Sequence, residues 1–119
     1  MSEFVFFFRA SAEEQREHMG TPEQAQRSMQ AWMAWIRELE AKGHLKNPGQ
    51  PLEPTGKVLR GGSKVVTDGP YAEAKELVLG FLVLEARDLA QAVDLANGCP
   101  MVEGGGGSVE IRPVANMSM

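Results

Sequence analysis

The run Leu77–Glu85 reads Leu-Val-Leu-Gly-Phe-Leu-Val-Leu-Glu and decides the fold, because no polar side chain interrupts it before its last residue. Successive side chains of a strand point to opposite faces, so a run without alternation predicts a strand that is covered on both faces. The stretch Glu3–Arg9, which reads Glu-Phe-Val-Phe-Phe-Phe-Arg, has the same character. Both runs are expected at the centre of one sheet, with Gly80 marking a bulge or the close approach of another backbone.

Two helices are expected between the strands. Segment 21–24 (Thr-Pro-Glu-Gln) combines an N-cap with a proline at the first helical position, and it predicts a long amphipathic helix over 22–42 that ends at Gly43. Asp88 is the predicted cap of a second helix, which ends at segment 97–98 (Asn-Gly). The apolar stripes comprise Ala25, Met29, Trp32, Ile36 and Leu39 in the first helix and Leu89, Ala92, Val93 and Ala96 in the second.

The remaining segments are less regular. Residues 11–19 form a polar connection with capping-box spacing at its start, which permits a turn of helix. Residues 47–56 contain three prolines and are expected to be a loop or an irregular edge. Residues 57–67 predict two short strands around the Gly-Gly pair at 61–62, and residues 109–114 alternate like a strand with one solvated face.

The resulting order β, α, β or hairpin, β, α, β predicts an α+β, ferredoxin-like fold. Right-handed crossovers place both helices on one side of an antiparallel sheet with strand order 4-1-3-2. The two apolar runs then occupy the central positions, and the more polar segments 57–67 and 108–114 are expected at the edges. Since the helices cover one face only, the other apolar face should pack against a second copy, which predicts a homodimer with a barrel-like core.

Composition narrows the class of protein. A chain of 119 residues is expected to be one domain, 1–119. Its net charge of −4 argues against binding to nucleic acid. The lone Cys99 predicts a reducing, cytoplasmic setting without zinc, and Phe4–Phe8 is too short and too poor in flanking basic charge to be a signal sequence or a membrane span.

A polar cluster stands where the hairpin segment meets the second central strand. Residues 68–76 read Asp-Gly-Pro-Tyr-Ala-Glu-Ala-Lys-Glu, and polar side chains at the end of a buried strand are held by a rigid scaffold. Asp68 is the candidate catalytic residue, as a general base, or it forms an Asx-turn before Gly-Pro. Glu73 is expected to be solvated, whereas Lys75 and Glu76 line a cleft or form ion pairs with Arg60 or Arg112.

This segment resembles the Asp-Gly-Pro-Phe-Ala-Glu-Thr-Lys-Glu signature of the YCII-related family, in its DGPF-type branch. Gly80-Phe81 and the closing Glu-Ile-Arg-Pro at 110–113 fit the same pattern. The resemblance implies a bacterial, dimeric α+β barrel, linked with sigma-factor-type transcription genes and without a settled activity. Tyr71 and Ala74 depart from the signature, and neither histidine matches the His-Asp pair proposed for broader relatives.

Other candidates have structural alternatives. Trp32 is either a wall of a ligand pocket or a core residue, and Trp35 shares both interpretations. His18 reaches Asp68 only if its loop covers a barrel mouth, and His44 fits a cation at a helix C-terminus. The glycines at 104–107 lack a phosphate-loop pattern and are expected to form a loop, and Cys99 has no partner for a nucleophilic role.

The leading hypothesis is a small-molecule pocket bounded by helix 22–42, Asp68 and residues 11–19, with ligand-binding candidates Tyr71, Lys75, Glu76, Trp32 and His18. Acid/base chemistry by Asp68 is its narrower form. The alternative is a non-catalytic interaction or regulatory module, and a cofactor-dependent oxygenase rests on fold analogy alone. No metal or cofactor is predicted.

Overall fold

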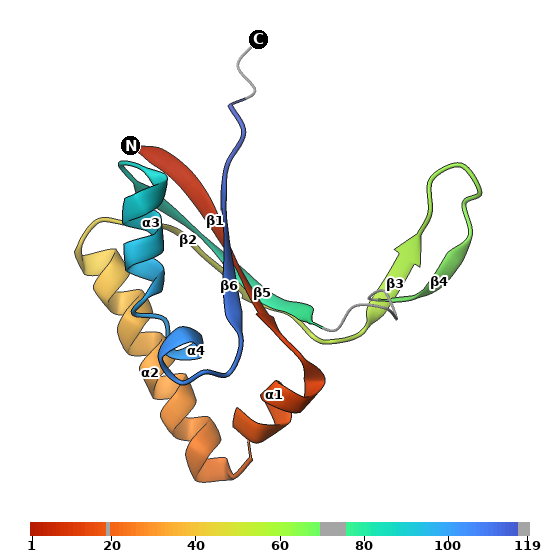
Figure 1. The fold of residues 1–119 in the computed structure, drawn as a ribbon, viewed down its shortest axis with the longest axis horizontal. Helices are drawn as coiled ribbons and strands as arrows, with labels where there is room; N and C mark the ends of the chain where they lie inside the picture. The colour runs from red at the N-terminus through yellow and green to blue at the C-terminus, as the bar shows by residue number, and fades with distance from the viewer. Residues whose placement is uncertain (19, 70–75, 117–119) are drawn as a thin grey trace.

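The computed structural model describes residues 1–18, 20–69 and 76–116, with the backbone alone at His18. Figure 1 shows one layer of helices packed on one side of a sheet, and a separate hairpin that stands away from both. The elements are β1 (Ser2–Ala10), α1 (Ala12–His18), α2 (Pro22–Ala41), β2 (Leu45–Pro51), β3 (Gly56–Leu59), β4 (Val66–Gly69), β5 (Leu77–Ala86), α3 (Leu89–Ala96), α4 (Pro100–Glu103) and β6 (Ser108–Pro113).

The main sheet is antiparallel, with strand order β2-β5-β1-β6. This is the predicted 4-1-3-2 order, and the two apolar runs are its central strands, β1 and β5. The side chains of one sheet face, such as Phe6 and Leu82, are buried against Trp35 and Leu39 of α2 and against Ala92 of α3. The predicted ferredoxin-like α+β fold is confirmed.

One edge of the sheet differs from the prediction. The edge strand beside β5 is Leu45–Pro51, whereas 57–67 falls in a separate two-stranded sheet formed by β3 and β4. Prolines are tolerated at a sheet edge, since no outward N–H is needed there. Gly49 has φ +64°, and a Cβ on it would lie 1.7 Å from the Phe81 carbonyl oxygen. The pairing of β2 with β5 is irregular, with register shifts on both sides of Asn47. The sequence of β2 therefore lacks the regular pattern of a strand.

The predicted helix starts are confirmed by their caps. The Thr21 hydroxyl accepts from the Gln24 N–H at 3.1 Å, and the Gln24 side chain accepts from the Thr21 N–H at 2.9 Å. A second reciprocal pair joins Ser11 and Glu14 at the start of α1, with both distances 3.0 Å. Asp88 Oδ1 accepts from the Gln91 N–H at 2.8 Å. Each bond satisfies an N–H that has no partner within its helix.

The glycine run after α4 forms the turn into β6. Gly105 has φ +72°, and a Cβ on Gly107 would lie 2.3 Å from the Arg9 carbonyl oxygen. Helix α4 itself, Pro100–Glu103, was not predicted, because a single turn carries no periodic signal. Within the described residues no helix is both long and apolar enough to cross a membrane.

The sheet face opposite the helices, here called the open face, carries an apolar centre. Val5 lies opposite Val83, and Phe7 lies opposite Phe81, on the two central strands. All four side chains are only partly buried. Charged residues surround this centre, including Lys46, which contacts the Glu3 carboxylate at 3.5 Å and the Glu85 carboxylate at 3.6 Å.

Candidate functional site

A cavity of about 740 Å³ lies between α2 and the sheet. Helices α1 and α2 form one wall, strands β1, β2 and β5 form another, and α4 closes one end. Most of its surface is apolar, and its polar lining residues carry few charges. The side chains most relevant to a ligand are Phe8, Met29, Trp32, Ile36, Leu82 and Met101.

Phe8 and Trp32, which line the cavity, belong to an aromatic cluster between β1 and α2. The rings of Phe8 and Trp32 meet edge to face with centroids 4.7 Å apart, and Trp32 meets Trp35 at 5.7 Å. The Trp35 Nε1 donates to the Leu95 carbonyl oxygen at 3.2 Å, which ties α2 to α3. Trp32 therefore packs against the core and also lines the cavity, and its ligand-binding role stays a prediction.

Gly80 explains why there is space beside Phe8. The two residues are partners across β1 and β5, next to the register shift after Phe8. A Cβ on Gly80 would lie 3.2 Å from the Gln50 carbonyl oxygen and 3.8 Å from Phe8 Cδ2. A larger residue would therefore press on the β2 edge or fill the cavity floor.

The polar lining is nearly neutral. Glu17 on α1 and Arg27 on α2 contribute one charge of each sign, and Gln15, Gln24 and Ser28 contribute uncharged polar groups. Such a lining favours neutral ligands with a few hydrogen-bonding groups. Because Met29 and Met101 have flexible side chains, the walls can adapt to ligands of different shape.

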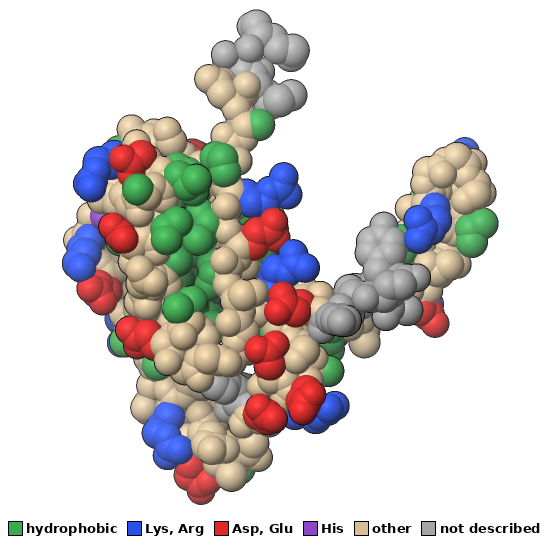
Figure 2. Space-filling view, in the orientation of Figure 1, with side chains coloured by type: hydrophobic (Ala, Val, Ile, Leu, Met, Phe, Trp, Pro, Cys, Tyr) green, Lys and Arg blue, Asp and Glu red, His purple; other side chains and the backbone are tan. Residues whose placement is uncertain are grey.

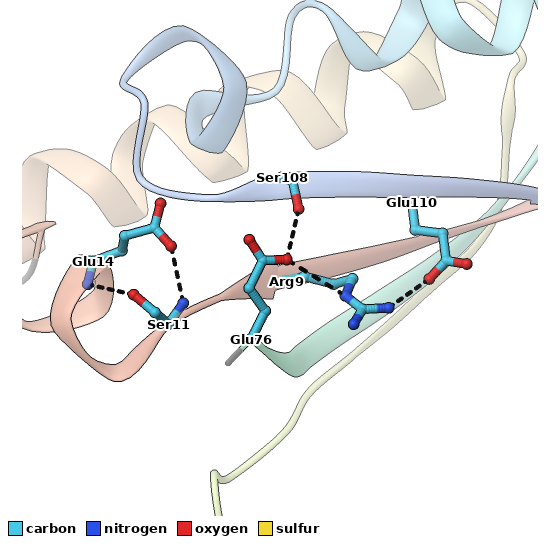
Figure 3. Close-up of polar contacts among 6 residues, drawn as sticks. All are labelled: Arg9, Ser11, Glu14, Glu76, Ser108 and Glu110. Carbon is cyan, nitrogen blue, oxygen red and sulfur yellow. Dashed lines mark hydrogen bonds and ion pairs between the residues drawn. The ribbon is translucent and has the colours of Figure 1, made fainter. Parts of the chain in front are cut away.

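A second polar cluster lies at one end of the open face (Figure 3). Arg9 Nη1 donates to Glu110 Oε1 at 2.8 Å, and its Nε lies 3.8 Å from Glu76 Oε2. Ser108 Oγ donates to the same Glu76 oxygen at 3.4 Å. Glu76 thus pairs with Arg9, whereas the sequence pointed to Arg60 or Arg112. These side chains are each more than a third exposed, so the ion pairs contribute little stability.

Asp68 does not line the cavity. It lies on β4 opposite Lys57, whose Nζ contacts Asp68 Oδ1 at 2.5 Å, and its side chain is 91% exposed. Tyr71, Glu73, Ala74 and Lys75 lie outside the described residues, as does the His18 side chain. The structure therefore brings Trp32 to the cavity and places Asp68 elsewhere. The catalytic role predicted for Asp68 and the ligand-binding roles predicted for the other candidates stay predictions; these candidates are Tyr71, Lys75, Glu76, Trp32 and His18.

His44 and Cys99 are the two other side chains that were considered for a chemical role. His44 Nδ1 lies 2.8 Å from the Glu85 carbonyl oxygen. Cys99 is fully buried, and burial raises the pKa of its thiol to about 11. A buried, protonated thiol is a poor nucleophile. Among the residues described, no three His, Cys, Asp or Glu side chains are grouped so that they could hold a metal ion.

The comparison with known proteins gives the family. The family model described as the YCII-related domain matches residues 4–118 of the sequence. The chain belongs to the YCII-related domain family. An uncharacterized protein of Rhizobium meliloti (strain 1021) is 41% identical over 54 residues, which span 45% of this chain and 44% of that protein.

A solved structure has a similar fold. It is the 5-chloro-2-hydroxyhydroquinone dehydrochlorinase TftG of Burkholderia phenoliruptrix AC1100, in complex with 2,5-dihydroxybenzoquinone. The alignment has a TM-score of 0.51 and 13% identity, and it covers 96% of this chain and 94% of the other. At this identity the similarity supports the fold alone.

The predicted boundaries of the pocket agree with the cavity in part: helix 22–42 and residues 11–19 contribute lining residues, whereas Asp68 does not. Sequence reasoning missed the lining contributed by β2, which was expected to be a loop or an irregular edge, and by α4. The sequence signal for the β5 side of the cavity was Gly80, because a glycine inside an otherwise apolar strand marks the close approach of another group.

Proposed function

We propose that this YCII-related protein binds a small, largely apolar, ring-containing molecule in the cavity between α2 and the sheet. The observation that carries the proposal is the cavity itself, whose volume of about 740 Å³ falls within the range of roughly 300–1,000 Å³ typical of small-molecule sites. Phe8 and Trp32 offer an aromatic edge and face against which a planar ring can pack.

The nearly neutral lining favours an uncharged ligand. A ligand with a full charge would lose its hydration inside an apolar cavity, and Glu17 and Arg27 offset each other. The dehydrochlorinase TftG gives weaker support, since a protein of the same fold forms a complex with a six-membered-ring compound.

We also propose that the protein is a homodimer in the cytoplasm, with the open faces of two sheets packed together. Support comes from the apolar centre formed by Val5, Phe7, Phe81 and Val83, which no described helix of its own chain covers. The buried, free Cys99 fits a reducing compartment. The narrower assignment to the DGPF-type branch belongs to this proposal too.

Acid/base catalysis by Asp68 is the narrowest form of the proposal. The carboxylate can act on a molecule in the cavity only if its hairpin, or the hairpin of a second copy, lies over the cavity, since Asp68 lines no part of the cavity in one subunit. Binding in the cavity does not depend on this step.

The test uses the two tryptophan indole N–H signals in a ¹H–¹⁵N spectrum of the protein, titrated with the neutral probe 1-naphthol. The Trp32 signal should shift with saturation, because Trp32 lines the cavity. The Trp35 signal should shift less, because its N–H is bonded to Leu95. The substitution Ala25→Phe places a ring in the cavity and should weaken binding at least tenfold.

Ala34→Phe is the matched control. It lies on the same helix, is exposed, and does not line the cavity, so it should bind the probe like the unmodified protein. Equal binding by all three proteins, or no saturable shift at millimolar probe, would refute the cavity as a ligand site. That result would favour the alternative of a non-catalytic interaction or regulatory module.

A further inference from the structure

The hairpin of β3 and β4, residues 56–69 and here called the arm, stands away from the rest of the chain (Figure 1). The radius of gyration is 15.9 Å, whereas a compact domain of this length has about 13.5 Å. The longest dimensions are 50 and 46 Å against 19 Å for the shortest. The arm extends the molecule in a direction where its own chain offers it little support.

An isolated two-stranded hairpin has marginal stability in water and gains stability from packing on other elements. The arm carries apolar side chains for such packing: Leu59 is 66% exposed, Val65 is 52% exposed and Val66 is 60% exposed. Leu59 and Val66 lie directly opposite each other across the two strands, so their side chains share one face of the arm.

The direction of the arm indicates what it packs on. In Figure 1 the helices lie on one side of the main sheet, and the arm rises on the other side, next to the open face. Figure 2 shows the space between the arm and the charged side chains of the main body. A body stacked on the open face would therefore be flanked by the arm.

The charge of the arm fits a second copy of the same chain. The arm holds Lys57, Arg60 and Lys64 against the single carboxylate of Asp68, a net charge of +2. Since the whole chain carries −4, the residues outside the arm carry −6. An arm from one copy is thus attracted to the body of another.

From these observations we infer that the arm is a clasp that packs against the second copy in the homodimer. The inference rests on the homodimer proposed above and adds the contact that holds it together. In a two-fold assembly the clasp is reciprocal, so each subunit grips the other. Asp68 then lies at the partner subunit, which accounts for its 91% exposure within one chain.

The test is the double substitution Leu59→Ser and Val66→Ser, which removes apolar surface from one face of the arm without touching the core. The dimer dissociation constant from sedimentation equilibrium should rise about tenfold or more. The control is Leu89→Ser and Val93→Ser on α3, which are 49% and 44% exposed and lie outside the arm. It should change the constant less than about threefold.

The outcomes separate the two proposals. An unchanged dissociation constant in the arm variant refutes the clasp and leaves the homodimer standing. A monomer of 13.0 kDa for the unmodified protein refutes the homodimer and the clasp together. Thermal unfolding followed by circular dichroism shows whether the main body of the arm variant stays folded. Loss of the dimer by a variant with a folded main body supports the clasp.

Discussion

The Cys99 thiol offers a sharp test of the core. Its side chain is fully buried among the core residues, and burial raises its pKa from 9.0 to about 11. The neutral thiol is thus the form that the folded state prefers. The chain has one cysteine, so any thiol chemistry reports on this residue alone.

The sign and size of the pH effect follow from this shift. Because the folded pKa lies above the unfolded one, the stabilisation is complete below pH 9 and is lost as pH rises toward 11. Each pH unit within this window costs about 1 kcal/mol of unfolding free energy. By pH 10 the protein should have lost about 1 kcal/mol through this group alone.

The assay is urea unfolding of the unmodified protein and of Cys99→Ala at pH 7.5 and pH 10. All other ionisable groups are the same in the two proteins, so their effects cancel in the difference between the two. The unmodified protein should lose about 1 kcal/mol more than Cys99→Ala between these pH values. In addition, Ellman's reagent at pH 8 should leave the Cys99 thiol of the folded protein unmodified, whereas the thiol of the urea-unfolded protein should react at once. Equal pH dependence with fast reaction of the folded protein would refute the buried, protonated thiol.

Two further predictions concern the sheet edge and the second helix. Gly49→Ala should lower the free energy of unfolding by about 2–4 kcal/mol, because its Cβ would lie 1.7 Å from the Phe81 carbonyl oxygen. Gly43 also has positive φ but open space around it, so Gly43→Ala should lower the free energy of unfolding by only about 1 kcal/mol. Equal losses for the two variants in urea unfolding would contradict the close approach at Gly49. Asp88→Ala should lower the free energy of unfolding by about 1 kcal/mol, because it removes the N-cap of α3. The control Asp94→Ala, at an exposed position of the same helix, should lower it much less. An Asp88→Ala protein as stable as the original would show that the cap contributes nothing.

The sequence predicted the centre of the fold because the physics there is local. An apolar run without alternation must be a strand covered on both faces, and the caps at Thr21 and Asp88 use short side chains three residues from their partners. The strand order then followed from the handedness of the crossovers. None of these inferences required knowledge of distant contacts.

The edge strand and the side of the cavity formed by β2 and α4 could not be predicted in this way. Strand β2 contains two prolines and a glycine with positive φ, and it is a strand only because the Phe81 backbone lies beside it. The cavity depends on Gly80 facing Phe8 across two strands and on α4, a single helical turn. These features are set by long-range packing, which no local pattern encodes.

The candidate site shows the same division. Helical spacing favoured core packing for Trp32, and its side chain packs against the core and also lines the cavity. Asp68 was chosen because it precedes a buried strand, yet its side chain lies on the exposed arm beside Lys57. Proximity in sequence to a core strand does not establish proximity to a cavity, since a hairpin can carry the residue away from the main body.

A crystal structure of the protein soaked with 1-naphthol is the decisive test of ligand binding in the cavity between α2 and the sheet. We expect electron density for the ring between the Trp32 side chain and Gly80, in contact with Phe8. An empty cavity at saturating probe, or density confined to the open face or the arm, would contradict it.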